Sequence, residues 1–214
     1  MWLKDKVIFL DIPKCGTTSM HKAAGFPKHL PHPMNSVPNK VGHTKHSRHI
    51  PNSIDYSYIF TVVRNPYTRS ISLWNHVNKL KNSLLNGKIK RTANQYLTEE
   101  YFNSFEHFLE VCKEINENVD SVNETETFLL VHCSCYTWTR SLPRVDKVIR
   151  LEEFEKERYL LPLRIDGLPV INIGKEHFIL SKDQRIKIEQ AFFEDFHLYE
   201  YNISNPAPPS RNLE

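Results

Sequence analysis

Short apolar runs alternate with amphipathic stretches along the chain, and this pattern predicts strands that alternate with helices. Val7–Asp11 (VIFLD) and Tyr58–Val63 (YIFTVV) are nearly continuous in apolar character, as expected of strands that are covered on both faces. Val145–Ile149 is a third run of this kind. The alternation predicts an α/β fold in which helices pack in layers around a mostly parallel sheet.

Four segments carry helix signals, either a capping residue or apolar residues at helical spacing: Thr18–Ala24, Asn65–Lys81, Ser104–Ile115 and Ser181–Phe196. A hydroxyl side chain is the expected cap of the first helix. Asn65 is the expected cap of the second, with Pro66 as its first helical residue. The polar, basic stretch Asn82–Asn94 is predicted to be a loop.

Length and composition fit one soluble globular domain. The chain has 214 residues, of which 40% are hydrophobic and 25% charged. We expect a single domain over residues 1–204 and a disordered tail over residues 205–214. No segment approaches the ~18 apolar residues of a membrane span. The apolar stretch at the start is too short for a signal peptide. The expected location is the cytoplasm, although a removed leader or a Golgi-type anchor would also fit.

The net charge of +3 conceals a strong asymmetry. Residues 1–98 contain 15 Lys and Arg against three Asp, a net charge of +12, whereas residues 99–214 contain 13 against 22 acidic residues, a net charge of −9. The basic half favours an anionic partner. The four Cys are too few for a disulfide framework and contain no CxxC pair, so we expect reduced, buried thiols.

The turn after the first strand, IPKCGTTS (residues 12–19), has the composition of an anion-binding loop. A helix that begins there offers unpaired N–H groups and the positive end of its dipole. Gly16 lets the backbone approach a ligand closely, and Lys14 adds a positive charge. Hydroxyl donors follow from Thr17, Thr18 and Ser19. This turn predicts a site for a phosphate or sulfate group.

The turn differs from the common nucleoside-triphosphate loop, GxxxxGK[ST]. That loop places its Lys after a second Gly, whereas here Lys14 precedes the only Gly. A kinase or ATPase is therefore a weaker interpretation.

A second strand and helix carry TVVRNPYTRSISLW (residues 61–74). Arg64 follows the carboxyl end of the predicted strand, where open α/β sheets bind ligands. Arg69 and Ser72 are three residues apart and share a helix face. Arginine presents a fork of donors that suits a second phosphate group. The alternative is that Arg64 pairs with a carboxylate and Ser72 only packs.

Together the two segments resemble the sulfotransferase family. IPKCGTTS resembles its 5′-phosphosulfate loop, P-K-x-G-[ST]-[ST], and VVRNPYTRSISLW its 3′-phosphate motif, V-R-x-P-x-x-R-x-x-S. Looser similarity to the carbohydrate-sulfotransferase branch, within a resemblance over about residues 7–202, lies in Gly42–Ile50, Val145–Glu157, Leu168–Asn172 and Phe192–Asn202. The resemblance implies a P-loop-like three-layer fold. It also implies the donor 3′-phosphoadenosine-5′-phosphosulfate, released as adenosine 3′,5′-bisphosphate.

The resemblance also implies roles for individual residues. Lys14 would offset the charge that grows on the bridging oxygen as the sulfuryl group leaves. The 3′-phosphate would be bound by Arg64 and Ser72, and Arg69 would be a third contact or, as we favour, a buttress. The 5′-phosphosulfate would accept hydrogen bonds from the backbone N–H groups of Cys15, Gly16, Thr17 and Thr18. The hydroxyls of Thr17 and Thr18 would also donate to it, and Ser19 belongs to the same donor-binding turn. The chemistry requires no metal.

The acceptor needs a base, and five of the 11 His fall in one stretch: His29, His32, His43, His46 and His49. His43 best matches the position of a functional residue in related enzymes, and His46 is the second choice; other branches use Glu. A zinc site in this stretch is a minor alternative, because no Cys or acid accompanies the His.

Two further features are interpreted as structural rather than functional. His132-Cys133 resembles a phosphatase signature, but Arg140 lies at the wrong spacing from Cys133 and Cys135, so both thiols are expected to be structural. Tyr136 and Trp138 offer rings that stack on a base or a sugar, although core packing is the favoured interpretation.

The sequence thus predicts an enzyme that moves a sulfuryl group from the nucleotide donor to a hydroxyl or, as a second option, an amine. A carbohydrate-like acceptor is favoured, and the basic segments Lys40–Arg48 and Lys79–Arg91 would suit an anionic glycan; a small metabolite is equally allowed. Nucleic acid is not an expected partner. The alternatives are an ATP-dependent phosphotransferase and a non-catalytic module that binds nucleotides or polyanions.

Overall fold

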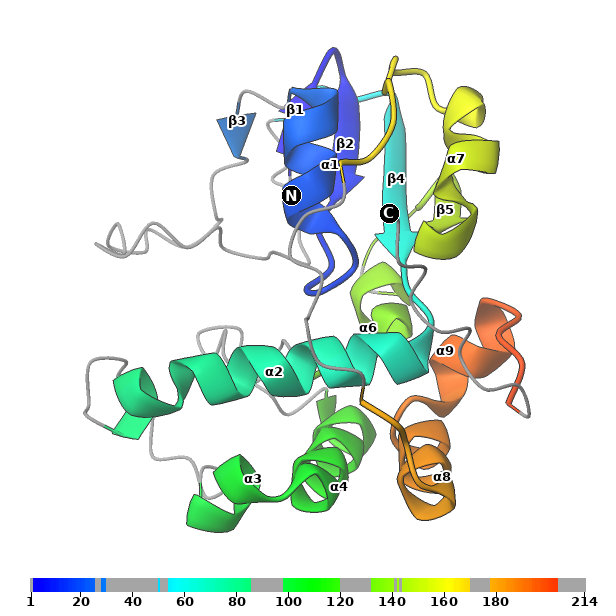
Figure 1. Ribbon diagram of the computed structural model, residues 1–214. Coiled ribbons are helices and arrows are strands. Elements are labelled where there is room, and N and C mark those ends of the chain that lie inside the picture. The colour runs from blue at the N-terminus through cyan, green and yellow to red at the C-terminus, as the bar shows by residue number, and fades with distance from the viewer. Residues whose placement is uncertain are drawn as a thin grey trace.

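The computed structural model describes residues 2–25, 28–29, 50, 54–85, 98–119, 132–140, 142, 144–169 and 178–203. Its strands are β1 Trp2–Lys4, β2 Val7–Leu10, β3 Lys28–His29, β4 Tyr58–Val63 and β5 Lys147–Arg150 (Figure 1). Its α-helices are α1 Thr17–Ala24, α2 Pro66–Leu85, α3 Glu99–Asn103, α4 Phe105–Glu117, α6 Cys135–Arg140, α7 Phe154–Glu157, α8 Lys182–Ala191 and α9 Phe193–Leu198. Two 3₁₀ turns are η2 Leu151–Glu153 and η3 Arg158–Leu160.

The strands form one sheet in the order β3-β1-β2-β4-β5. The pairs β2–β4 and β4–β5 are parallel, whereas β1 runs antiparallel to both of its neighbours. A two-residue hairpin, in which Asp5 and Lys6 have φ values of 50° and 62°, joins β1 to β2. Because β2 and β4 are paired and parallel, the segments that follow them meet at the same edge of the sheet.

Side chains from both faces of the sheet are buried, in two separate clusters. Val7 and Phe9 pack with α1 and α7 on one face, while Ile8 and Leu10 pack with α2, α4, α6, α8 and α9 on the other. The near-continuous apolar character of the two central strands follows from this double coverage. The predicted three-layer α/β fold is confirmed.

Several predicted elements match closely. The strand Tyr58–Val63 has the predicted bounds, and Asn65 caps α2, since its Oδ1 accepts the Tyr67 N–H at 3.0 Å. Ser181 and Gln184 form the predicted capping box.

Three details of the predicted helices were wrong. The cap of α1 is Gly16, with no side-chain hydrogen bond, rather than a hydroxyl residue. Helix α2 continues to Leu85, into the segment predicted to be a loop. The predicted helix after Ser181 is two helices, because the backbone leaves helical geometry at Phe192.

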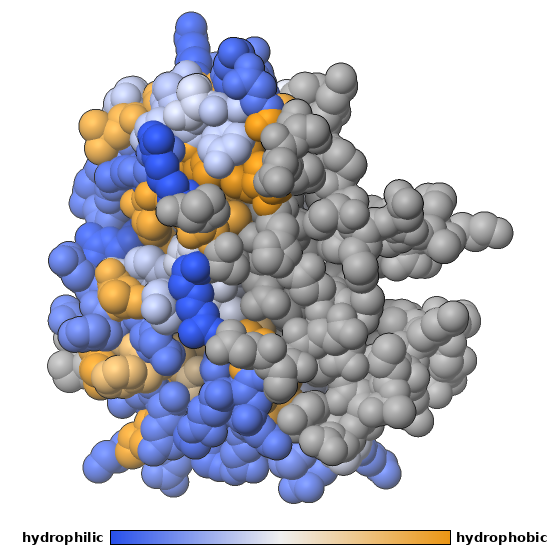
Figure 2. Space-filling model, turned by 180° about the vertical axis from the view of Figure 1, so that it is seen from behind, coloured by the Kyte–Doolittle hydropathy of each residue, from blue (hydrophilic) through white to orange (hydrophobic). Residues whose placement is uncertain are grey.

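The described surface is mostly polar on the face shown in Figure 2. Hydrophobic residues gather beside the grey atoms in the upper part of that view and form smaller groups below.

All four Cys are free and buried, as predicted. None of the helices in the described ranges combines the length and apolar character needed to cross a membrane.

Candidate functional site

Among the described residues, a row of backbone N–H groups in the turn between β2 and α1 has no hydrogen-bond partner. Lys14 and Gly16 have positive φ values of 66° and 84°, and Gly16 caps α1. The Cys15 N–H donates within the turn to the Ile12 carbonyl at 3.3 Å, and Met20 donates the first helical hydrogen bond, to Gly16. In the described part of the chain, the N–H groups of residues 16–19 have no acceptor. This arrangement suits an anion at the helix start.

The hydroxyl groups of the turn differ in their surroundings. Thr17 Oγ1 donates to Asp11 Oδ1 at 2.5 Å, with the Ile12 carbonyl oxygen 3.2 Å away. Thr18 is exposed, whereas Ser19 is buried in α1. Thr17 therefore fastens the turn to the buried Asp11 carboxylate at the end of β2, and Thr18 presents its hydroxyl to solvent.

Gly16 is required by its backbone and by its neighbour. Its φ of 84° is one that other residues rarely adopt, and a Cβ added there would lie 2.9 Å from Leu151 Cδ1. Leu151 follows β5, so a third strand end packs directly against the turn.

We expect Gly16→Ala to lower the free energy of unfolding by about 0.5–1.5 kcal/mol more than Gly25→Ala does, because Leu151 must leave its preferred rotamer; chemical denaturation measures the difference. Gly25 also has a positive φ, 58°, but a Cβ there would meet only Lys4 Nζ, at 3.8 Å. The control thus carries the backbone strain without the collision with Leu151. Equal losses for the two variants would show that Leu151 does not restrict the turn.

Arg64 joins the second strand end to the turn. Its Nη1 donates to the Lys14 carbonyl at 3.4 Å, and its Nε donates to Thr68 Oγ1 at 3.0 Å. Glu152 Oε1 accepts the N–H of Asn65 at 2.9 Å and fixes the start of α2. The guanidinium of Arg64 is thus held against the backbone of the Lys14 turn.

Both cations of the site are less stable in their charged form than they are in water. Burial lowers the pKa of Lys14, and the positive charges of Arg64 and Lys79 lower it further. Burial also lowers the pKa of Arg64, although Glu152 opposes that shift. Neither side chain forms an ion pair with a described carboxylate. A bound anion would relieve both the repulsion and the loss of hydration.

Arg69 lies beneath the turn and is 1% exposed. Its Nε donates to the Pro13 carbonyl at 3.2 Å and its Nη2 to the Cys133 carbonyl at 2.9 Å. These contacts agree with the favoured role of a buttress. Ser72 is half-buried on α2, about two turns from Arg64.

The remaining candidates fall into two groups. Trp138 and Cys133 are fully buried, as the packing interpretation predicted, and His132 is buried as well. Tyr136 is half-buried, with the Arg140 guanidinium 5.7 Å from its ring centroid. His43 and His46, with most of the predicted basic segments and residues 205–214, lie outside the described residues.

The described ranges contain no group of three His, Cys, Asp or Glu arranged to hold a metal.

Sequence reasoning missed several residues that shape the site: Asp11, Leu151, Glu152 and Asp195. Glu152 had a usable signal, because it follows the third parallel strand, where ligands and their supports gather. Leu151 had no such signal, because a leucine after a strand does not indicate a contact with a distant glycine such as Gly16.

One comparison with known proteins identifies a family. The family model described as Sulfotransferase family matches residues 3–162, well over half of the chain. The matched segment contains the Lys14 turn and Arg64. No curated protein and no solved structure matches the chain significantly. With both sequence motifs, the three-layer fold and the family match in agreement, the chain belongs to the sulfotransferase family.

Proposed function

We propose that this protein transfers a sulfuryl group from 3′-phosphoadenosine-5′-phosphosulfate to a hydroxyl acceptor. One observation carries the proposal: the Arg64 guanidinium contacts the backbone of the Lys14 turn. This contact supports the proposal, because the two segments predicted to bind phosphate follow the paired strands β2 and β4, and one nucleotide with phosphates on its 3′ and 5′ positions would need both segments close together.

The turn supplies the 5′ end of this site. The free N–H groups of residues 16–19 and the Thr18 hydroxyl would bind the 5′-phosphosulfate, and Lys14 would stabilise the leaving phosphate. Thr17 would contribute its N–H while its hydroxyl holds Asp11. The N–H of Cys15 already donates to Ile12, so its contact with the donor would require that bond to open.

The reaction is an in-line displacement. The acceptor oxygen forms a bond to sulfur while the bond from sulfur to the bridging oxygen breaks, and adenosine 3′,5′-bisphosphate leaves. The acceptor proton passes to a base. Lys14 lowers the barrier because it neutralises charge that develops only as the bridging oxygen departs. Arg64 and Ser72 bind the distant 3′-phosphate and so select the donor.

His43 is our candidate for the base and His46 the second. A histidine suits this step because its pKa lies near neutrality. A carbohydrate-like acceptor fits the branch resemblance and the basic segments Lys40–Arg48 and Lys79–Arg91. An amine is the second acceptor class.

Donor competition tests the proposal. Purified protein is heated with adenosine 3′,5′-bisphosphate or with ATP, and labelled donor is then incubated with a panel of sugars and small alcohols. We expect the bisphosphate to raise the unfolding temperature more than ATP at equal concentration, and label to appear in an acceptor. Protection by ATP alone would favour a phosphotransferase. Protection by the bisphosphate with no transfer to any acceptor class would favour a binding module.

The alkaline limb of kcat/KM should lie below pH 10.5, the ordinary pKa of lysine, because the pKa of Lys14 is lowered in the free enzyme. Only protonated Lys14 carries the charge, so the rate falls as pH rises through its pKa. Lys14→Arg should move this limb upward, since arginine stays protonated. A limb that Lys14→Arg leaves in place would belong to another group.

A further inference from the structure

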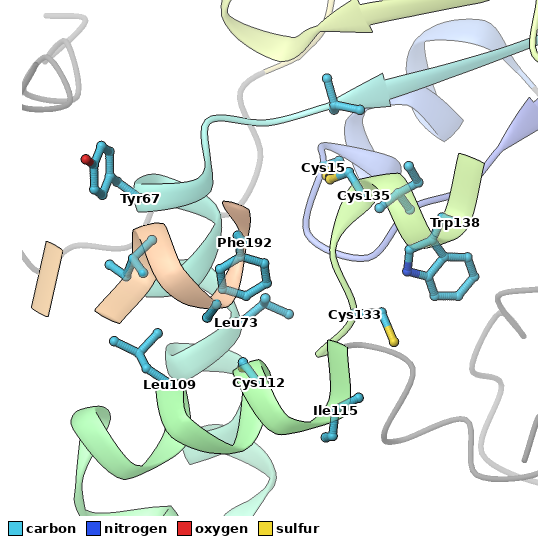
Figure 3. Packing of buried hydrophobic residues seen from close by; sticks show 14 of the residues in the cluster. Cys15, Tyr67, Leu73, Leu109, Cys112, Ile115, Cys133, Cys135, Trp138 and Phe192 are labelled. Atoms are coloured by element: carbon cyan, nitrogen blue, oxygen red, sulfur yellow. The ribbon is translucent and has the colours of Figure 1, made fainter. Parts of the chain in front are cut away.

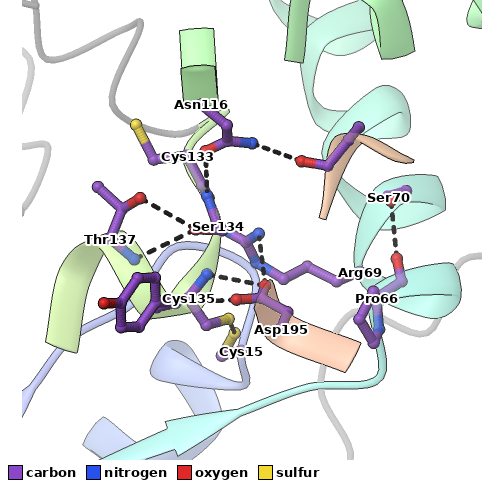
Figure 4. A network of polar contacts seen from close by, with 12 residues as sticks. Cys15, Pro66, Arg69, Ser70, Asn116, Cys133, Ser134, Cys135, Thr137 and Asp195 are labelled. Atoms are coloured by element: carbon purple, nitrogen blue, oxygen red, sulfur yellow. Dashed lines mark hydrogen bonds and ion pairs between the residues drawn. The ribbon is translucent and has the colours of Figure 1, made fainter. Parts of the chain in front are cut away.

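A buried polar network contacts the turn that carries Lys14 and Cys15 (Figure 4). At its centre, the Arg69 side chain on α2 donates to the carbonyl oxygens of Pro13 and Cys133. The Pro13 carbonyl belongs to the peptide bond that leads into Lys14. The orientation of that peptide helps set the direction in which the Lys14 side chain leaves the backbone.

Asp195, on α9, holds the other side of this network. Its Oδ2 accepts the Cys135 N–H and its Oδ1 the Tyr136 N–H, each at 2.8 Å, and Oδ2 lies 4.0 Å from Arg69 Nη1. One carboxylate thus binds the first turn of α6 and faces the guanidinium that supports the donor turn (Figure 4).

The network is closed to solvent, and its parts depend on one another. Asp195 is 0% exposed and Arg69 is 1% exposed. Burial raises the pKa of Asp195, while Arg69 and the two backbone N–H groups favour its ionised form. Beside them, the thiols of Cys15 and Cys135 lie 3.6 Å apart, so the turn and α6 are in direct contact (Figures 3 and 4). A shift of α6 or of Arg69 would therefore be transmitted to the turn.

We propose that Asp195 is a positioning residue for sulfuryl transfer, which acts through Arg69 to fix the peptide before Lys14. This positioning role rests on the proposed function, sulfuryl transfer. Asp195 lies on α9, outside the segment that the family model matches, residues 3–162. In this proposal, a C-terminal helix supports a site whose ligand-binding residues lie in the first half of the chain. Since Lys14 acts in the transition state, its misplacement should reduce kcat far more than donor affinity.

The test compares Asp195→Asn with Asp146→Asn. The control makes the same substitution in a carboxylate that also accepts a backbone N–H, from Ile59 at 2.8 Å, but at the opposite edge of the sheet. We expect Asp195→Asn to lower kcat about 10- to 100-fold and to change the affinity for adenosine 3′,5′-bisphosphate less than about threefold. Asp146→Asn should leave kcat within about twofold, even if its unfolding temperature falls.

A second readout does not depend on turnover. Amide hydrogen exchange of the peptide that spans residues 11–19 should accelerate in Asp195→Asn and stay unchanged in Asp146→Asn. If Asp195→Asn does not fold, Arg69→Lys replaces it, because lysine keeps the buried positive charge but not the fork that reaches both carbonyls; the expected results are the same.

The outcomes separate the two proposals. An Asp195→Asn variant that matches the control in kcat and in exchange of residues 11–19 would overturn the positioning role. A wild-type protein that neither binds the bisphosphate nor transfers a sulfuryl group would overturn the proposed function. In that case the exchange of residues 11–19 would still decide whether Asp195 holds the turn.

Discussion

Lys14→Ala should reduce kcat by about 10²- to 10³-fold while donor affinity stays within about tenfold. Lys14 is half-buried at the donor turn, where burial and the positive charge of Arg64 lower its pKa, and its charge is most useful when negative charge appears on the departing oxygen. Ground-state binding depends more on the free N–H groups of residues 16–19, which the substitution leaves in place. Single-turnover kinetics and calorimetric titration with adenosine 3′,5′-bisphosphate measure the two quantities separately.

Lys22→Ala is the matched control for this experiment. Lys22 is an exposed lysine on α1, the helix that follows the donor turn, so its removal takes away one positive charge close to the turn without changing the turn itself. We expect kcat and affinity to stay within about twofold of wild type. If Lys14→Ala reduced affinity as strongly as kcat, Lys14 would be a ground-state anchor, and a binding role would be favoured.

Arg64→Ala should weaken binding of adenosine 3′,5′-bisphosphate by about 10- to 100-fold, since a hydrogen bond to a charged group contributes about 1.5–3 kcal/mol. Binding of adenosine 5′-phosphate, which lacks the 3′-phosphate, should change by less than about threefold. The difference between the two nucleotides isolates the contact with the 3′-phosphate. Calorimetric titration of both nucleotides into both proteins measures it.

The control for Arg64 is Arg164→Ala, at a side chain that is 89% exposed and pairs with Asp166. It should leave both affinities unchanged. Equal weakening of both nucleotides by Arg64→Ala would mean that Arg64 acts on the turn through the Lys14 carbonyl rather than on the 3′-phosphate.

Local patterns predicted much of the framework because local chemistry determines it. Tyr58–Val63 is apolar on both faces because both faces are covered, and Asn65-Pro66 marks a helix start through one side-chain bond and one fixed φ. The Lys14 turn and Arg64 were found in the same way, since each follows a recognisable strand.

Contacts between distant segments could not be predicted from such patterns. The hairpin between β1 and β2 has Asp5 and Lys6 as its two turn residues. Both have positive φ, but neither is a glycine, the residue whose presence would have indicated such a turn. The Thr17 hydroxyl was predicted to face the ligand, but Asp11, six residues earlier, accepts its hydrogen bond instead. Asp195 lies about 60 residues beyond the α6 N–H groups that it binds, and only the folded chain brings them together.

A crystal structure with adenosine 3′,5′-bisphosphate tests the central claim most directly. We expect one nucleotide to lie across the ends of β2 and β4, with its 5′-phosphate on the N–H groups of residues 16–19 and its 3′-phosphate on the Arg64 guanidinium. A nucleotide bound elsewhere, or one whose 3′-phosphate points away from Arg64, would contradict the assignment of these two strand ends to a single donor.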